Sequence, residues 1–278
     1  MLMRGCAVTP RQDGMLAHLI GVHGCYGTRK TPNLAMLTAY FDESGIHKGD
    51  HLCVVAGWVG NDTQWLSFVA DWIKALGHRK NLHMKSLRSW EGHRSYYARL
   101  LSKLGPIPEE HHLRPVYGGI WQRDHEEIVK GKVKETFTSA YMLAAQLCMK
   151  AALQTLPASE TLAYVFAQQK VYKNAAQRLH DVVFRVGKFD SRVLGVDFIV
   201  PASTVCLDPA DFLAFQLREY NSDPSSLKAK LGMPIFGKSG GKGFGVGHIH
   251  TKKELSDLVA TLVRLGFLPE DTLHKGNK

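Results

Sequence analysis

The stretch MLTAYFDESGIHKGDHLCVVAGWV, residues 36–59, decides how this chain is interpreted. Two β-prone runs, Leu37–Phe41 and Leu52–Val59, flank a turn that contains Gly and Asp, so a β-hairpin is expected. Where the first run ends, Tyr40-Phe41-Asp42-Glu43-Ser44-Gly45 places two adjacent carboxylates at the transition from strand to turn. Strand ends and the loops after them often carry reactive groups in α/β folds. The simpler alternative is an Asx-type turn in which Gly45 supplies a positive φ angle.

Strand-like and helix-like segments alternate after this hairpin. An amphipathic helix is expected over Thr63–Leu76, because its apolar residues recur at spacings of three and four. Further strands are expected at Val116–Trp121, Thr161–Phe166 and Arg192–Val200, and further helices at Lys132–Leu153, Tyr172–Phe184, Pro209–Tyr220 and Lys252–Leu265. The interleaving predicts an α/β fold, with a mixed sheet flanked by helices.

The chain divides into three expected segments. Residues 1–35 show no helical or strand period, and we expect an N-terminal extension that is disordered or non-essential, with Met36 as an alternative functional start. Residues 36–220 form the predicted α/β domain. In residues 221–278, Asn221–Gly247 is rich in Gly, Ser, Lys and Pro and predicts a long loop, and the helix after it is expected to pack on the same domain.

Composition narrows the class of protein. The 278 residues contain 35 Lys and Arg against 25 Asp and Glu, a net charge of +10 that favours a polyanionic partner, most commonly nucleic acid. With 45% hydrophobic residues, a disordered chain is excluded. No apolar run approaches the roughly 20 residues of a membrane span, and the five cysteines form no CxxC pair. We expect a cytoplasmic protein without membrane association; its oligomeric state stays open.

A second candidate acid lies in Leu207-Asp208-Pro209-Ala210-Asp211. Asp208 is expected as a helix N-cap and Pro209 as the first helical residue, which places Asp211 in the first turn. Interaction with the helix dipole is one explanation for Asp211. The other is a divalent metal ion shared with Asp42, because the segment around Asp211 is otherwise apolar and a buried carboxylate needs a cationic partner.

These residues resemble the bacterial and phage family catalogued as domain of unknown function 3800, whose fold is similar to RNase H. The family's Asp-Glu-Ser-Gly string is matched by Asp42 to Gly45, and its late-helix motif Leu-Gln-x-Ala-Asp-x-x-Ala is matched by Leu207, Ala210, Asp211 and Ala214. A weaker middle element is matched by His83, Lys85 and Ser86. The resemblance covers about residues 36–220 and implies an RNase H-like mixed sheet with a metal-dependent, nuclease-like site.

The chain departs from the family at two positions. Asp208 stands where the family has Gln, which adds a carboxylate. Ala167 follows Phe166 where the family often has Glu. If that Glu is a metal ligand, this chain lacks it, and three alternatives stay open: the site tolerates the loss, the protein is a natural pseudo-enzyme, or the chain is a deliberately inactivated variant.

We therefore expect a metal-dependent nuclease that cleaves RNA or DNA, with Mg²⁺ or Mn²⁺ as the cofactor. One or two such ions can activate a water molecule and stabilise the leaving oxygen of a phosphodiester. The expected metal ligands are Asp42, Asp211, Glu43 and, as the weakest candidate, Asp208. His83 and Lys85 are expected to hold the scissile phosphate or transfer a proton. The alternative is that both are surface residues.

A basic segment follows the first predicted helix. Its candidate nucleic-acid contacts are Arg79, Lys80, Lys85, Arg88 and Arg94, and the aromatic residues Trp90, Tyr96 and Tyr97 are interleaved with them. Basic side chains neutralise phosphates and aromatic rings stack on unpaired bases. A solvated helix face combined with ordinary core aromatics explains the same pattern.

Gly232–Ser239 matches the letters of a nucleotide-binding P-loop, but it follows a polar run and precedes a Gly-rich one, so a flexible basic loop with Lys238 and Lys242 is favoured over an ATP-driven switch. His248 and His250 alternate on one strand face, and the sequence shows no third metal ligand nearby. A non-catalytic nucleic-acid-binding or adaptor protein is the alternative to a nuclease.

Overall fold

A six-stranded sheet forms the centre of the computed structural model, which describes residues 36–47, 49–87, 90–129, 139–168, 191–239 and 245–264. The strand order is β5-β4-β1-β2-β3-β6. The strands are β1 (Met36–Ser44), β2 (Leu52–Asn61), β3 (Arg114–Trp121), β4 (Thr161–Ala167), β5 (Val193–Ile199) and β6 (Val246–His250). β1, β2 and β3 form an antiparallel meander, β4 and β5 continue parallel to β1, and β6 pairs parallel with β3.

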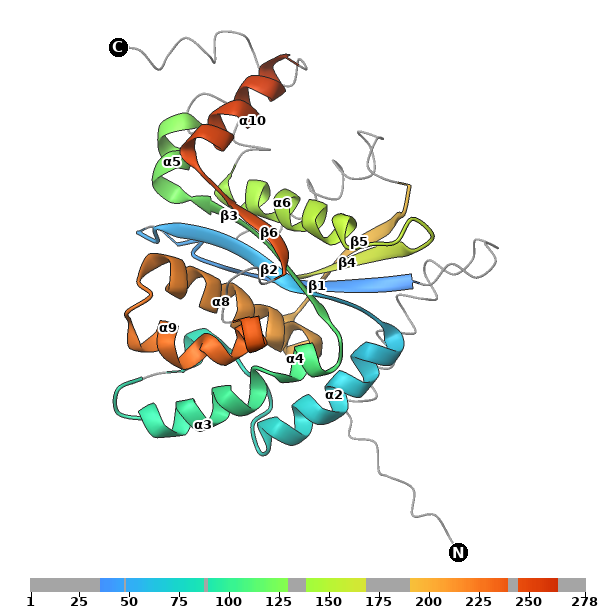
Figure 1. Ribbon diagram of the computed structural model, residues 1–278, viewed down its shortest axis with the longest axis vertical. Coiled ribbons are helices and arrows are strands. Elements are labelled where there is room, and N and C mark those ends of the chain that lie inside the picture. Colours follow the sequence, from blue (N-terminus) through green and yellow to red (C-terminus); the bar gives the residue numbers. More distant parts are fainter. Residues whose placement is uncertain are drawn as a thin grey trace, which may run out of the picture.

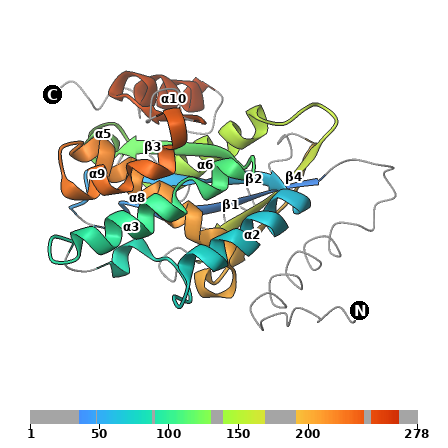
Figure 2. The ribbon, with the colours of Figure 1, turned by 60° about the horizontal axis from the view of Figure 1, so that its bottom comes forward.

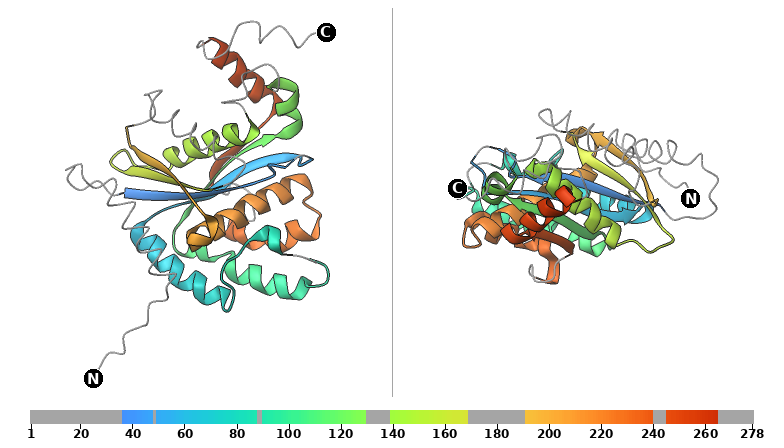
Figure 3. Two further views of the ribbon diagram at one scale, coloured as in Figure 1. Left: turned by 180° about the vertical axis from the view of Figure 1, so that it is seen from behind. Right: turned by 90° about the horizontal axis from the view of Figure 1, so that it is seen from above.

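Helices cover both faces of this sheet (Figure 1). One face carries α6 (Ala140–Gln154), and α5 (Gln122–Ile128) contacts α10 (Lys252–Arg264) at the β3–β6 edge, as Figure 3 shows from behind. On the opposite face, α8 (Asp208–Ser222) packs directly against β1 and β2. Farther from the sheet on that side lie α2 (Asp62–Leu76), α3 (Arg94–Leu104), α4 (Ile107–Glu110) and α9 (Leu227–Gly232), all below the sheet in Figure 1. Figure 2 shows α2 and α3 on the side away from α10. This arrangement confirms the predicted α/β fold with a mixed sheet flanked by helices.

Alternation along β1 divides the core into two layers. Tyr40 belongs to the cluster on the α8 side, together with Trp58, Trp65 and Trp72, whereas Phe41 belongs to the cluster on the α6 side. Successive residues of a strand point to opposite faces. Asp42 therefore shares the face of Tyr40 and α8, and Glu43 shares the face of Phe41.

The start of α2 follows from its sequence. The Asn61 side chain accepts a hydrogen bond from the Gln64 amide at 2.9 Å, and the Gln64 side chain accepts one from the Asn61 amide at 2.8 Å. This capping box satisfies two amides that the helix itself leaves without a partner. It fixes where the β2 strand ends and the helix begins.

Substitution of Asn61 by Ala is expected to lower the free energy of unfolding by about 1 kcal/mol, because the Gln64 amide loses its acceptor. Urea denaturation measures the change. Asn61→Ser, which keeps a capping oxygen, is the matched control and should stay close to the parent. If Asn61→Ser lowers the free energy of unfolding as much as Asn61→Ala does, the loss does not come from the capping hydrogen bond.

Most predicted elements are confirmed to within two residues. They include the helix at α2, the strands at β3, β4 and β5, and the helices at α8 and α10. The helix predicted from Lys132 is observed as α6 from Ala140, and residues 130–138 lie outside the described residues. The predictions for residues 1–35 and for the helix at Tyr172–Phe184 also lie outside them.

Three predictions are corrected. β1 continues to Ser44, so Asp42 and Glu43 lie within the strand and not in the turn; Gly45 does adopt the expected positive φ, of 80°. Asp208 is the first helical residue and not the N-cap, which is Leu207. The loop predicted over residues 221–247 contains α9, whose N-cap Ser226 accepts from the Ala229 amide, and the 3-10 helix η5 (Met233–Ser239).

The P-loop alternative is not supported by this arrangement. Gly232 ends α9, so a helix and not a buried strand precedes the motif. The flexible loop favoured for Gly232–Ser239 is also wrong, because Ile235 and Phe236 of η5 are buried in the core. Among the described residues, no helix has the length and apolar character to span a bilayer.

Candidate metal centre

Asp42 is a buried carboxylate near the end of β1. Only 6% of the residue is exposed, and its Oδ1 accepts a hydrogen bond from the Glu43 amide at 2.8 Å. Burial raises the pKa of Asp42 well above its usual value, and the negative charges of Glu43 and Asp211 raise it further. Among the described residues, no Lys or Arg forms an ion pair with Asp42. An ionised Asp42 would therefore gain much from a cation.

Asp211 reaches the same region from the first turn of α8. Its Oδ2 accepts a hydrogen bond from the Met84 amide at 2.8 Å and lies 2.9 Å from Nδ1 of His83. The charge of Asp211 contributes to the raised pKa of Asp42, so the two carboxylates interact across the contact between α8 and β1. The two acidic residues are 169 positions apart in the sequence, and the packing of α8 on β1 places their elements in contact.

Ala167 is the last residue of β4, the strand next to β1. β1 and β4 are parallel, and Phe41 pairs with Phe166, so Asp42 and Ala167 follow as neighbours at the ends of adjacent strands. Ala167 belongs to the core cluster on the α8 side, the face that also carries Asp42. A carboxylate at this position would lie beside Asp42.

Glu43 lies on the other face of the sheet. It pairs with Val55 of β2, and its charge contributes to the raised pKa of Cys53, which belongs to the core cluster on the α6 side. Its charge also raises the pKa of Asp42. A hydrogen bond between the Glu43 and Asp42 side chains raises the pKa of Asp42 as well, so the two carboxyl groups stay within reach of each other although Glu43 occupies a strand position on the α6 side.

Asp208, the fourth candidate ligand, forms hydrogen bonds with residues of neighbouring elements. Its Oδ2 accepts hydrogen bonds from the indole Nε1 of Trp72 at 3.1 Å and from the Leu82 amide at 3.0 Å. The oxygen thus joins α2, the segment after it and the start of α8. These contacts explain the buried position of Asp208 without a metal ion.

His83 is the N-cap of the 3-10 helix η1 (Met84–Ser86), and Lys85 lies within this helix. The His83 side chain is 55% exposed, and its hydrogen bond with Asp211 raises its pKa. Nζ of Lys85 lies 3.0 Å from Nε2 of His47, in the turn after β1. His47 was missed by sequence reasoning, and its place four residues after Glu43 is the only signal that could have indicated it.

The basic segment after α2 is only partly as expected. Lys80, Lys85 and Arg94 are exposed, and Arg88 lies outside the described residues. Tyr96 is also exposed and receives a hydrogen bond from Nε of Arg79 at 2.7 Å. Trp90 and Tyr97, in contrast, are buried core residues, which agrees with the alternative of ordinary core aromatics at these two positions.

The Asp42 and Asp211 pair suits a hard divalent cation. Carboxylate oxygens are the ligands that Mg²⁺ and Mn²⁺ prefer. Among the described residues, however, Asp42 and Asp211 belong to no group of three acidic, His or Cys residues whose ligand atoms all lie within 4.8 Å of one another. Ala167 occupies the position beside Asp42 from which a third carboxylate could come.

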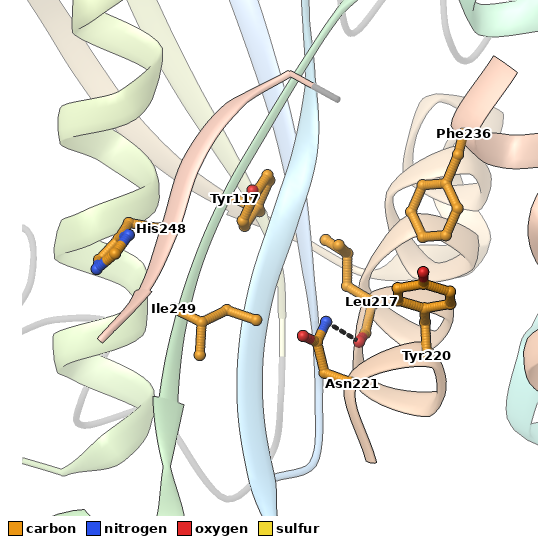
Figure 4. A pocket seen from close by; sticks show the side chains of 7 residues that line it. All are labelled: Tyr117, Leu217, Tyr220, Asn221, Phe236, His248 and Ile249. Atoms are coloured by element: carbon orange, nitrogen blue, oxygen red, sulfur yellow. Dashed lines mark hydrogen bonds between the residues drawn. The ribbon is translucent and has the colours of Figure 1, made fainter. Parts of the chain in front are cut away.

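A separate cavity of about 250 Å³ lies between β3 and β6 on one side and α8 and η5 on the other (Figure 4). Its lining residues are Tyr117, Leu217, Tyr220, Asn221, Phe236, His248 and Ile249. Neither Asp42 nor Asp211 is among them. The cavity is therefore distinct from the candidate metal centre.

Comparisons with known proteins give distant structural similarities. No protein-family model and no curated protein matches the chain. A chain in the structure of the PCNA–RNase HII complex from Archaeoglobus fulgidus is 16% identical, with 84% of this chain and 91% of that chain covered and a TM-score of 0.37. Bst-RNase HIII in complex with Mn²⁺ is 11% identical, with coverages of 82% and 70% and a TM-score of 0.36.

Proposed function

We propose that the protein is a metal-dependent nuclease of the RNase H-like fold, related to the family that its sequence resembles. The observation that carries the proposal is that α8 packs against β1 and carries the buried Asp211, whose negative charge helps to raise the pKa of the buried Asp42. Two buried like charges are unfavourable unless a cation or a proton lies with them. A bound Mg²⁺ or Mn²⁺ would provide that cation.

The residues of the site have distinct roles in this proposal. Asp42 and Asp211 would hold the ion, which when bound supplies Lewis-acid activation of a water molecule. The Met84 amide and His83 fix one oxygen of Asp211, so the carboxylate needs little rearrangement to bind. His83, half-exposed with a raised pKa, is suited to donate a proton to the leaving oxygen. Lys85 would contact a phosphate, with His47 beside it.

The substrate class follows from charge and position. The net charge of +10 favours a polyanion. The segment that binds Asp208 and Asp211 through the Leu82 and Met84 amides also carries Arg79, Lys80 and Lys85. A nucleic-acid backbone bound along this segment would lie next to the carboxylates. The proposal leaves RNA and DNA as alternatives.

The experiment compares the given chain with Ala167→Glu and Asp42→Asn in nuclease assays. Single- and double-stranded RNA, DNA and an RNA–DNA hybrid are supplied with Mg²⁺ or Mn²⁺. Ala167→Glu is expected to raise the cleavage rate, because a third carboxylate would lie beside Asp42. Asp42→Asn should lower the metal-dependent rate by at least about 100-fold, since even partners outside the ligand set commonly cost 10–100-fold.

A second candidate, a non-catalytic nucleic-acid-binding protein, is favoured by Ala167 itself. In that case the given chain binds nucleic acid without cleaving it. If Ala167→Glu is folded and binds Mn²⁺ but cleaves none of the substrates, the nuclease proposal fails and the binding function remains.

Lys85→Gln is expected to weaken nucleic-acid binding equally for all sequences and to reduce the slope of log K against log salt concentration by about 1. The reason is that one phosphate contact, and the counterion released with it, is lost. Fluorescence anisotropy across a salt series measures the slope. Lys230→Gln, an exposed lysine on α9, is the control; an equal change there would point to net charge and not to a contact at Lys85.

A further inference from the structure

A second cluster of potential metal ligands lies at the edge of the sheet, away from Asp42. His248 and His250 pair with Gly118 and Ile120 of β3, and Ile120 is part of the core on the α6 side. Both imidazoles therefore belong to the α6 side of β6, and in Figure 4 His248 points away from Leu217 and Phe236. Glu254, in the first turn of α10, is the third ligand that the sequence did not reveal.

The three side chains are arranged closely enough for one ion. Their ligand atoms all lie within 4.8 Å of one another. Oε2 of Glu254 is 2.7 Å from Nε2 of His248 and 3.9 Å from Nδ1 of His250. Bonds of about 2.0 Å to a tetrahedral Zn²⁺ place ligand atoms roughly 3.3 Å apart. Movements of about 0.6 Å at each contact would reach that geometry.

The local structure holds the ligands in place before any ion binds. Thr251 and Glu254 form a capping arrangement at the start of α10, in which Oε2 of Glu254 accepts from the Thr251 amide at 2.9 Å and from its hydroxyl at 2.8 Å. Nδ1 of His250 is buried and has no hydrogen-bond partner among the described residues. A buried ring nitrogen without a partner is costly, and a metal ion would satisfy it.

We propose that His248, His250 and Glu254 form a binding site for a late first-row divalent metal ion, best matched by Zn²⁺, with solvent as the fourth ligand. Two imidazole nitrogens and one carboxylate suit Zn²⁺, whereas the oxygen ligands of Asp42 and Asp211 suit Mg²⁺ or Mn²⁺. The ion would replace the proton shared by His248 and Glu254. The ion would also link α10 to β6, because Glu254 lies on α10 and the two histidines lie on β6.

Zinc titration of the full-length, tag-free chain tests this site. The Asp42→Asn, Asp211→Asn double variant serves as the parent, so that the candidate centre at β1 and α8 does not contribute. Calorimetry is expected to show one Zn²⁺ bound per chain. His250→Gln in this parent should weaken the affinity about 100-fold or more. His78→Gln, an exposed histidine after α2, should leave it unchanged.

X-ray absorption at the zinc edge of the same Asp42→Asn, Asp211→Asn parent, with all its histidines in place, provides a second measurement that does not depend on a histidine variant folding. Two imidazole nitrogens and one or two oxygens at about 2.0 Å are expected. The proposal is overturned if no 1:1 binding is found, if binding survives His250→Gln unchanged, or if the spectrum shows only oxygen ligands. Each of these outcomes leaves the proposed nuclease function untouched, because Asp42 and Asp211 are absent from the parent.

Discussion

Asp42→Asn is expected to make the metal-free protein more stable at pH 7 while abolishing its stabilisation by Mn²⁺. The Asp42 carboxyl is buried, and its pKa is raised by burial and by the charges of Glu43 and Asp211. Asn has the same shape without the charge. The gain in the free energy of unfolding should be roughly 0.5–2 kcal/mol, the size typical of relieving a strained functional site. Urea denaturation in EDTA measures it.

The stability difference between Asp42→Asn and the parent is expected to depend on pH. Because its pKa is raised on folding, Asp42 binds its proton more tightly in the folded state than in the unfolded state. The stability of the metal-free parent should therefore decline as pH rises from about 4, the ordinary Asp value, through the raised folded value. Asp42→Asn lacks this decline, so the difference between the two chains should vanish as pH is lowered toward 4.

Mn²⁺ is expected to stabilise the parent more than Asp42→Asn, which is the opposite of the difference expected in EDTA. At a Mn²⁺ concentration 100 times the dissociation constant, the parent should gain about 2.7 kcal/mol and Asp42→Asn almost nothing. The exposed Glu91 provides the control, since Glu91→Gln removes a carboxylate far less buried than Asp42 and should behave like the parent. Lower stability of Asp42→Asn in EDTA, together with an intact Mn²⁺ effect, would mean that protein contacts and not a cation satisfy Asp42.

The sequence predicted the β1–β2 hairpin and the helices α2 and α8 because their signals are local. Apolar spacing marked α2, and Pro209 after Asp208 marked the start of α8. Periodicity says nothing about which strand a helix packs against, so the pairing of Asp42 with Asp211 rested on the expected burial of Asp211 and on the family resemblance. The pairing of β1 with β4, which places Ala167 beside Asp42, is a long-range contact of the same kind.

The largest error in the sequence interpretation, the loop over residues 221–247, has a physical cause. Gly, Ser, Lys and Pro dominate its composition, and α9 and η5 are too short to show a period. Their order comes from tertiary contacts: the Gln216 side chain donates to the Ala229 carbonyl at 2.6 Å, and Phe236 packs into the core. Ser226 as an N-cap was the one local signal for α9.

The role of Asp208 shows why a carboxylate in the right motif need not be a ligand. The sequence placed it one turn before Asp211 and offered it as a cap or a metal ligand. In the fold, its Oδ2 faces the Trp72 indole and the Leu82 amide, which are both far away in the sequence. Only the packing of α2 against the start of α8 reveals these contacts.

Asp208→Ala is expected to lower the free energy of unfolding by about 2–5 kcal/mol. The substitution leaves two buried donors, the Trp72 indole and the Leu82 amide, without this acceptor, and each unsatisfied buried donor costs about 1–3 kcal/mol. Asp208→Asn is the matched control, because it keeps one oxygen at the same place and should cost less. Equilibrium urea denaturation of both variants provides the measurement.

A double-mutant cycle with Trp72→Phe assigns part of this loss to the indole. If the hydrogen bond is real, Trp72→Phe should cost less in the Asp208→Ala background than in the parent, because the donor it removes is already without its acceptor. Mn²⁺ binding distinguishes the structural role from the metal-ligand role that the sequence suggested. Asp208→Asn should keep the Mn²⁺ affinity of the parent; a loss as large as that of Asp42→Asn, with little change in stability, would instead place Asp208 among the ligands.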